Sequence, residues 1–115
     1  MHVSDTSLVL DRKQLQDITL DDEALMREVL TALIDDTGRQ LSLLDSSIRQ
    51  QDSLSTARLA HYCKGACANI GANRAAATLK QIEVDARRGD FDLCSTGLQT
   101  LEVELDELRH EAAAL

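Results

Sequence analysis

His61, Lys64 and Gly65 are the residues of this 115-residue chain whose types and spacing could do chemistry together. They lie in the stretch AHYCKGACANIGA, residues 60–72, which we place on a helical wheel of about 100° per residue. Within about 60° of His61 on that wheel lie Ala57, Lys64, Gly65 and Ala68, whereas the opposite half holds Leu59, Cys63, Ala66, Cys67 and Ile70. Because the apolar half must face a core, we expect His61 to point into solvent.

The chemistry that suits these three residues is the binding of a phosphoryl group. An exposed imidazole is mostly neutral at pH 7, so one ring nitrogen keeps a lone pair that can attack. Lys64 follows at i+3 and brings a positive charge, and Gly65 at i+4 leaves space beside the ring. A glycine inside a helix costs about 1 kcal/mol relative to alanine, so it calls for a reason such as close approach of another molecule. Alternatively, His61 and Lys64 are ordinary surface residues and Gly65 marks a helix crossing.

The composition predicts that helices position these residues. Proline is absent, glycine occurs five times and aromatic residues make up 2% of the chain, which disfavours aromatic, turn-rich sheets. Apolar residues recur at steps of three and four, and Asp, Asn and Gly stand where helices begin and end. The first expected helix is 11–18, and the second is a long run from the cap Asp21 to about Gln50 that Gly38 could kink. A third helix is expected from after Asp52 to Ile70, a fourth from the cap Asn73 to Gly89, and a fifth from after Asp90 towards Ala113.

Short connections between these helices predict an all-α fold, an antiparallel four-helix bundle with a short additional N-terminal helix. The expected inward residues are Leu25, Val29, Leu33, Thr37, Leu41, Leu44 and Ile48 in the long helix, Ala75, Leu79, Ile82 and Ala86 in the fourth, and Leu98, Leu101, Leu105 and Leu108 in the fifth. A chain of this length is sufficient for one domain, so we expect a single domain over residues 1–115.

Charge and composition exclude several classes of partner. The net charge of −8 disfavours nucleic acid, which requires clustered Lys and Arg. The longest aliphatic stretch, Val29 to Ile34, is far shorter than the roughly 20 apolar residues that span a bilayer, and the first ten residues do not resemble a secretory leader. Three cysteines suit thiols that are kept reduced. We therefore expect a cytoplasmic protein without membrane contact.

Two segments of the chain resemble the histidine-containing phosphotransfer (HPt) domain family. The first is H-x-x-K-G in His61, Lys64 and Gly65, followed by ANIGA at residues 68–72. The second is Ile82, Glu83, Arg87, Gly89 and Asp90, which is similar to the family's L-E-x-x-x-R-x-G-D segment. Together they cover about thirty residues, and the predicted bundle matches the family fold over nearly the whole chain. Cys63, Ala66 and Cys67 depart from the family pattern, but they lie on the core half and affect packing rather than chemistry.

The resemblance implies an intermediate of a multistep two-component phosphorelay. His61 would accept a phosphoryl group from the aspartate of a receiver domain in a hybrid sensor kinase and pass it to the aspartate of a response regulator. Lys64 would stabilise the phosphoryl charge and Gly65 would give access. Arg87 would either add a second positive charge or only form a salt bridge with Glu83 at i,i+4. Recognition would fall to small and apolar residues around His61, namely Ala57, Ala68 and Leu54.

The same resemblance implies a carrier rather than an enzyme. Phosphoryl transfer depends mostly on positioning and charge stabilisation, and the Mg²⁺ would belong to the receiver, so the chain would need no cofactor. The sequence holds no G-x-x-x-x-G-K-[ST] loop and leaves no room for a nucleotide-binding domain, so we expect no autonomous kinase activity. We expect a monomer, because such a bundle completes its own core.

Three alternatives compete with this interpretation. A metal site could use His61, Cys63 and Cys67, but the two cysteines lie about 120–160° around the helix from the histidine and are better explained as buried thiols. A helical adaptor could bind a signalling partner without phosphorylation. A general acid–base enzyme is disfavoured because the acidic residues are spread over solvated faces instead of converging near His61. His2 and His110 are expected to be solvated surface residues.

Overall fold

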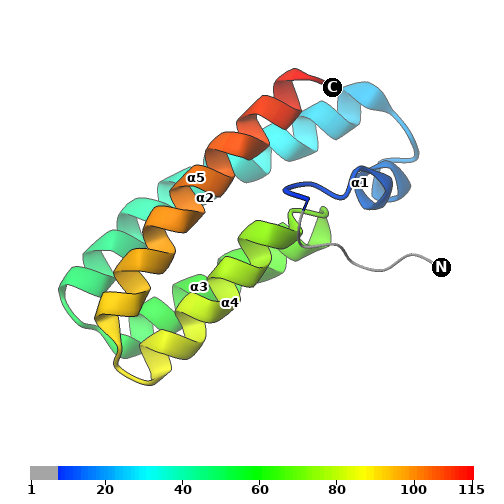
Figure 1. Cartoon of the computed structure of the whole chain (residues 1–115). Helices are drawn as coiled ribbons and strands as arrows, with labels where there is room; N and C mark the ends of the chain where they lie inside the picture. The colour runs from blue at the N-terminus through cyan, green and yellow to red at the C-terminus, as the bar shows by residue number, and fades with distance from the viewer. Residues whose placement is uncertain (1–7) are drawn as a thin grey trace.

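The computed structural model describes residues 8–115 and consists of five helices. They are α1 (Arg12–Ile18), α2 (Glu23–Arg49), α3 (Ser53–Asn69), α4 (Asn73–Arg87) and α5 (Phe91–Ala113). No strand occurs in this part of the chain. The long helices run antiparallel, with α2 beside α5 and α3 beside α4, and α1 lies across the end of the bundle where α2 begins and α5 ends (Figure 1). The predicted fold class is confirmed.

Aspartate caps begin four of the five helices. Each of these side chains accepts a hydrogen bond from the backbone N–H three residues later, as expected of an N-cap. The caps are Asp11, Asp22, Asp52 and Asp90. The predicted cap Asp21 was wrong by one position, because Leu20 and Asp21 both adopt positive φ in the turn after α1 and only Asp22 is extended.

The connection between α3 and α4 explains a second misplaced cap. Asn73 was predicted to cap α4, but it is the first helical residue, and Ala72 is the N-cap without a side-chain hydrogen bond. Gly71 ends α3 with φ of +90° and donates its N–H to the carbonyl of Ala68. This tight turn starts α4 one residue earlier than the side-chain pattern suggests.

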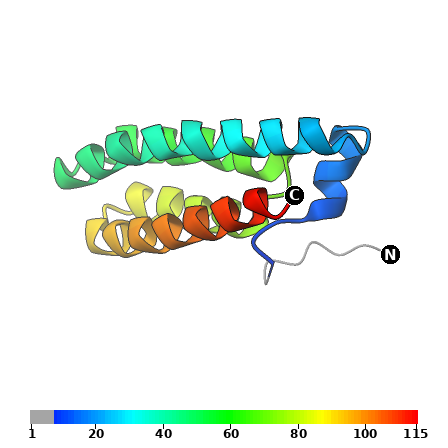
Figure 2. The same cartoon turned by 90° about the horizontal axis from the view of Figure 1, so that it is seen from above.

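The core lies between the four long helices and follows the predicted stripes on α4 and α5. The residues predicted to face inward on these two helices, four on each, are all buried. On α2 the prediction was wrong at Leu25, which is 40% exposed, while Met26 and Leu30 are buried instead. Because α2 packs against both α3 and α5, its apolar face is wider than a single stripe (Figure 2). The helix continues without interruption through Gly38.

The segment from Val9 to α1 closes one end of the core. Val9, Leu10 and Leu15 are buried there. The N–H of Asp11 donates to the carbonyl of Gly71 at 2.8 Å, and Arg12 pairs with Glu111 near the end of α5. A Cβ added at Gly71 would lie 2.7 Å from the Asp11 carbonyl, so this contact requires glycine. Among residues 8–115, no helix is long and apolar enough to cross a membrane.

Candidate functional site

His61 projects from the middle of α3 into solvent, as the helical wheel predicts. Its side chain is 64% exposed, and Gly65 and Ala68 on the same face are also exposed. Cys63 and Cys67 point the other way and are buried in the core. The predicted division of α3 into a core half and a solvent half is therefore correct around the histidine.

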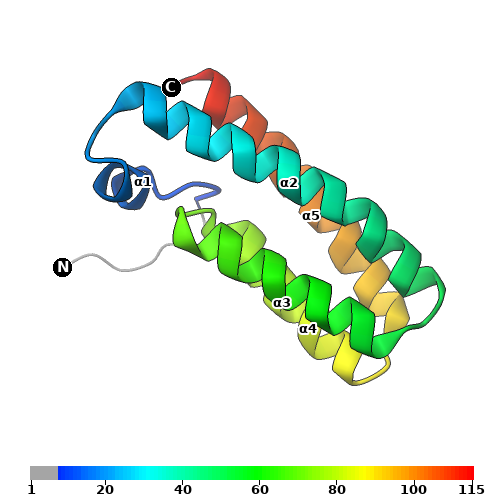
Figure 3. The same ribbon diagram turned by 180° about the vertical axis from the view of Figure 1, so that it is seen from behind.

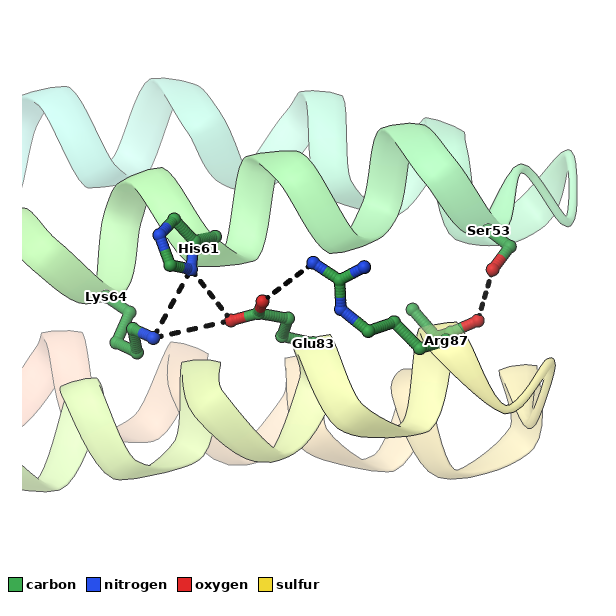
Figure 4. Close-up of polar contacts among 6 residues, drawn as sticks. Ser53, His61, Lys64, Glu83 and Arg87 are labelled. Carbon is green, nitrogen blue, oxygen red and sulfur yellow. Dashed lines mark hydrogen bonds and ion pairs between the residues drawn. The ribbon is translucent and has the colours of Figure 1, made fainter.

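Ala57 is a correction to the predicted face. It lies within the same half of the wheel as His61, yet it is only 2% exposed. The reason is that α4 packs along this flank of α3, where Ser53 donates its hydroxyl to the carbonyl of Ala86 (Figure 4). Ala57 is thus part of the helix–helix contact and cannot serve recognition, whereas Leu54 and Ala68 are exposed.

Glu83 of α4 brings a carboxylate against the imidazole. Its Oε1 lies 3.1 Å from Nδ1 of His61, and Nζ of Lys64 lies 3.4 Å from the same oxygen and 3.3 Å from Nδ1 (Figure 4). One acidic residue, Glu83, therefore lies beside His61, although the acids were expected to be spread over solvated faces. A wheel of one helix could not detect this carboxylate, because it comes from the neighbouring antiparallel helix.

Arg87 holds the other oxygen of that carboxylate. Its Nη2 lies 3.0 Å from Oε2 of Glu83, so the predicted i,i+4 salt bridge is present. The Arg87 side chain is 61% exposed, whereas that of Glu83 is only 12% exposed. The two oxygens of Glu83 thus face a histidine and a lysine on one side and an arginine on the other.

The surroundings of Glu83 favour its ionised form. Burial raises the pKa of this carboxyl, but hydrogen bonds from Arg87 and His61 and the charge of Lys64 outweigh it and hold the pKa below its ordinary value. Glu83 is therefore a carboxylate at neutral pH and accepts hydrogen bonds. An Nδ1–H of His61 that donates to Glu83 leaves the lone pair of the neutral ring on Nε2.

The space beside the ring is open at Gly65. A Cβ built at this glycine meets no heavy atom within 4 Å, so Gly65 is not explained by a helix crossing within residues 8–115. The structure therefore removes one alternative offered by the sequence. Nε2 of His61 makes no hydrogen bond to residues 8–115. The open space at Gly65 and this free nitrogen together leave an unobstructed approach to the solvent side of the imidazole.

The cysteines do not join His61 in a metal site. All three are buried free thiols, and burial raises the pKa of Cys63 to about 11, of Cys67 to about 12 and of Cys94 to about 11. Over the described range, no three His, Cys, Asp or Glu side chains are grouped so that they could hold a metal ion. His110 is exposed as predicted, and His2 lies outside the described residues.

Comparison with known proteins decides the family. The sequence profile of the Hpt domain matches residues 28–111, which include the whole of α3 and α4 and most of α2 and α5. The chain belongs to the Hpt domain family. Proteins of this family are phosphoryl carriers that interact with receiver domains in phosphorelays, and histidine phosphotransfer is accordingly the function of this Hpt chain.

Solved structures share the Hpt fold of this chain. Histidine-containing phosphotransfer protein B (HptB) from Pseudomonas aeruginosa PAO1 superposes with a TM-score of 0.84 at 24% identity, covering 92% of each chain. A putative histidine-containing phosphotransfer protein from rice superposes with a TM-score of 0.82 at 20% identity, covering 95% of this chain and 80% of the rice protein. No curated protein sequence matches the chain.

Proposed function

We propose that Nε2 of His61 accepts a phosphoryl group from the phosphoaspartate of one receiver domain and passes it to the aspartate of another. The donor receiver belongs to a hybrid sensor kinase and the acceptor receiver to a response regulator. The observation that carries the proposal is that Nδ1 of the exposed ring contacts Glu83 and Lys64, whereas Nε2 makes no hydrogen bond to residues 8–115.

The transfer exchanges one bond to phosphorus for another. The lone pair of Nε2 forms the P–N bond as the P–O bond to the donor aspartate breaks and its carboxylate leaves. The proton on Nδ1 remains between the ring and Glu83, whose negative charge stabilises the ring as it becomes electron-poor. Lys64, with Nζ 3.3 Å from Nδ1, supplies positive charge for the phosphoryl oxygens on one flank. The reverse steps release the group to the second receiver.

Arg87 has a role that follows from its salt bridge. By holding Oε2 of Glu83 it keeps the carboxylate aimed at His61, so we assign it first as a positioning residue. The other N–H groups of the exposed guanidinium are free to contact the phosphoryl group directly. Gly65 provides the space through which the receiver aspartate approaches.

The chain acts as a phosphoryl carrier and depends on its partner receiver domains for the rest of the reaction. The chain has no kinase activity of its own and needs no cofactor, and the Mg²⁺ of each transfer is held by the receiver domain. Buried, protonated thiols fit a cytoplasmic protein. We further propose that residues 1–115 form a single domain and that it acts as a monomer.

Labelling by a purified, phosphorylated receiver domain tests this function. The unaltered chain is expected to gain label at one acid-labile site, and His61→Gln is expected to gain none while its circular dichroism stays helical. His110→Gln is the matched control, because it also removes an exposed histidine from a helix. Receiver binding without label on the unaltered chain would instead indicate a non-phosphorylated adaptor, and persistent label on His61→Gln would refute the assignment.

A further inference from the structure

A groove between α2 and α3 is lined by Arg58 and Tyr62, which precede and follow the phosphoacceptor His61 on α3. Its volume is about 420 Å³, and its principal lining residues are Leu43 and Gln50 from α2 and Arg58, Leu59 and Tyr62 from α3. Figure 3 shows these two helices on the near face of the bundle. Leu43 is 54% exposed and Tyr62 is 59% exposed, so two large apolar side chains from neighbouring helices are open to solvent in the groove.

Arg58 places a positive charge at the edge of this groove. It precedes His61 by three residues, whereas Lys64 follows by three, so the two cations lie about 60° to either side of the histidine on the wheel. Lys64 is on the flank that faces Glu83, and Arg58 is on the flank that faces the groove. The two flanks of His61 are thus both basic, but only on the Lys64 flank is the cation paired with an acid.

The charge of Arg58 is not neutralised within residues 8–115. No ion pair or hydrogen bond joins Arg58 to an acidic side chain there, whereas Arg49 on the adjoining part of α2 pairs with Asp45 at 3.0 Å. The acid of the groove, Asp52, already accepts hydrogen bonds from the N–H and hydroxyl of Ser55 at the start of α3. An exposed cation without an ionic partner is complementary to a carboxylate on a docking protein.

We propose that Arg58 is a specificity-determining residue, which selects receiver domains that carry a carboxylate beside the apolar segment they lay into the Leu43–Tyr62 groove. This inference rests on the proposed function, because Arg58 lines the groove and is the i−3 neighbour of His61 on α3, so a receiver docked at His61 also reaches Arg58. Leu43 and Tyr62 then provide the apolar contact, and Arg58 distinguishes an acidic partner surface from a neutral or basic one. A charge at the edge of such an interface acts mainly on the rate of association and on its salt dependence.

The test compares two kinds of phosphoryl donor on matched variants. One donor is a phosphorylated receiver domain of a hybrid histidine kinase that phosphorylates the unaltered chain, and the other is phosphoramidate, which needs no docking. Arg58→Glu is matched by Arg109→Glu on α5, which makes the same charge change at an exposed i,i+3 pair. Leu43→Gln is matched by Leu93→Gln, since Leu93 is 50% exposed and also lies on α5. For each variant, the receiver-dependent rate is divided by the phosphoramidate rate.

We expect this ratio to fall about tenfold for Arg58→Glu and about threefold for Leu43→Gln, with both α5 variants within about twofold of the unaltered chain. Raising NaCl from about 50 mM to about 500 mM should slow the unaltered chain more than Arg58→Glu. Equal ratios for the groove variants and their controls would overturn the specificity proposal alone. Absence of label on His61 of the unaltered chain with both donors would overturn the phosphoacceptor assignment itself.

Discussion

Nδ1 of His61 lies 3.1 Å from Oε1 of Glu83, although the two residues are 22 positions apart and belong to different helices. The contact ties the orientation of the exposed ring to α4. Because Arg87 and Lys64 also contact the carboxylate, Glu83 is held in place and stays ionised. A surface histidine without such a contact would sample both tautomers, whereas here the hydrogen bond favours the tautomer with its lone pair on Nε2.

Replacement of Glu83 should therefore slow phosphoryl acceptance without unfolding the bundle. Glu83→Ala is expected to lower the initial rate of labelling by a phosphorylated receiver about tenfold, since a hydrogen bond to a charged group is lost. Glu83→Gln should fall between this variant and the unaltered chain, because its amide oxygen still accepts from Nδ1–H but carries no charge. The ¹⁵N shifts of the imidazole should move towards a mixture of tautomers. An unchanged rate in Glu83→Ala would exclude a positioning role.

Substitution of Gly65 should separate stability from access. Gly65→Ala should stabilise the chain by about 1 kcal/mol in urea denaturation, because the added methyl meets nothing within 4 Å and alanine is the better helix former. Gly65→Gln should also fold, but its longer side chain should slow receiver-dependent labelling about tenfold by occupying the approach to His61. If Gly65→Gln accepts phosphoryl groups at the unaltered rate, the open space has no role in access.

Much of the fold and part of the site could be predicted from sequence, for reasons visible at particular residues. Asp52, Asp90 and the positive-φ Gly71 and Gly89 fix helix ends through local contacts, which a local pattern contains. The outward direction of His61 follows from the apolar half of its own helix. The burial of Ala57 depends on which flank α4 covers, and that information lies in the packing of two helices rather than in one wheel.

The contact between His61 and Glu83 shows the same limit. The family resemblance gave Glu83 only as part of the second matched segment and as the i,i+4 partner of Arg87, and the acidic residues were expected to be spread over solvated faces. Sequence periodicity sets the faces of α3 and α4 but not their relative register, so it does not predict the 3.1 Å contact. For the same reason, the unpaired charge of Arg58 becomes apparent only once its neighbours on α2 are known.

Glu104 should make stability depend on pH in a direction opposite to that of most carboxylates. Burial between α4 and α5 raises the pKa of Glu104 above its ordinary value of 4.5, and the hydroxyl of Thr78 and the charge of Arg74 only partly offset this. The folded chain therefore holds this proton more tightly than the unfolded chain. The stability contributed is present below about pH 4.5 and is lost as pH rises through the folded pKa.

Glu104→Gln should remove the loss of stability that occurs as pH rises, since the amide can keep a hydrogen bond with Thr78 without a buried charge. Urea denaturation should show this as a difference in the free energy of unfolding between Glu104→Gln and the unaltered chain. The difference should favour the variant more at about pH 7 than at about pH 4. Asp106→Asn is the control, because its carboxylate on the same helix is 68% exposed. A stability difference that is the same at both pH values would contradict the direction of the Glu104 shift.

The cysteines should be unreactive while the chain is folded. Burial raises the pKa values of Cys63, Cys67 and Cys94 to about 11, 12 and 11, so almost no thiolate is present at about pH 8. A thiol reagent that forms a coloured product should therefore react with the native chain at the rate of its opening, and with all three cysteines at once in denaturant. Rapid stoichiometric reaction of the folded chain would show that α3 and α5 expose their core faces.

Identification of the phosphorylated nitrogen tests the central claim most directly. The chain is labelled with ¹⁵N, phosphorylated by a receiver domain and studied by long-range ¹H–¹⁵N NMR with ³¹P coupling. The account predicts a phosphorus coupling to Nε2 of His61 alone, with Nδ1 protonated and its proton shifted by the Glu83 hydrogen bond. Coupling of phosphorus to Nδ1, or to a nitrogen of another histidine, would contradict it.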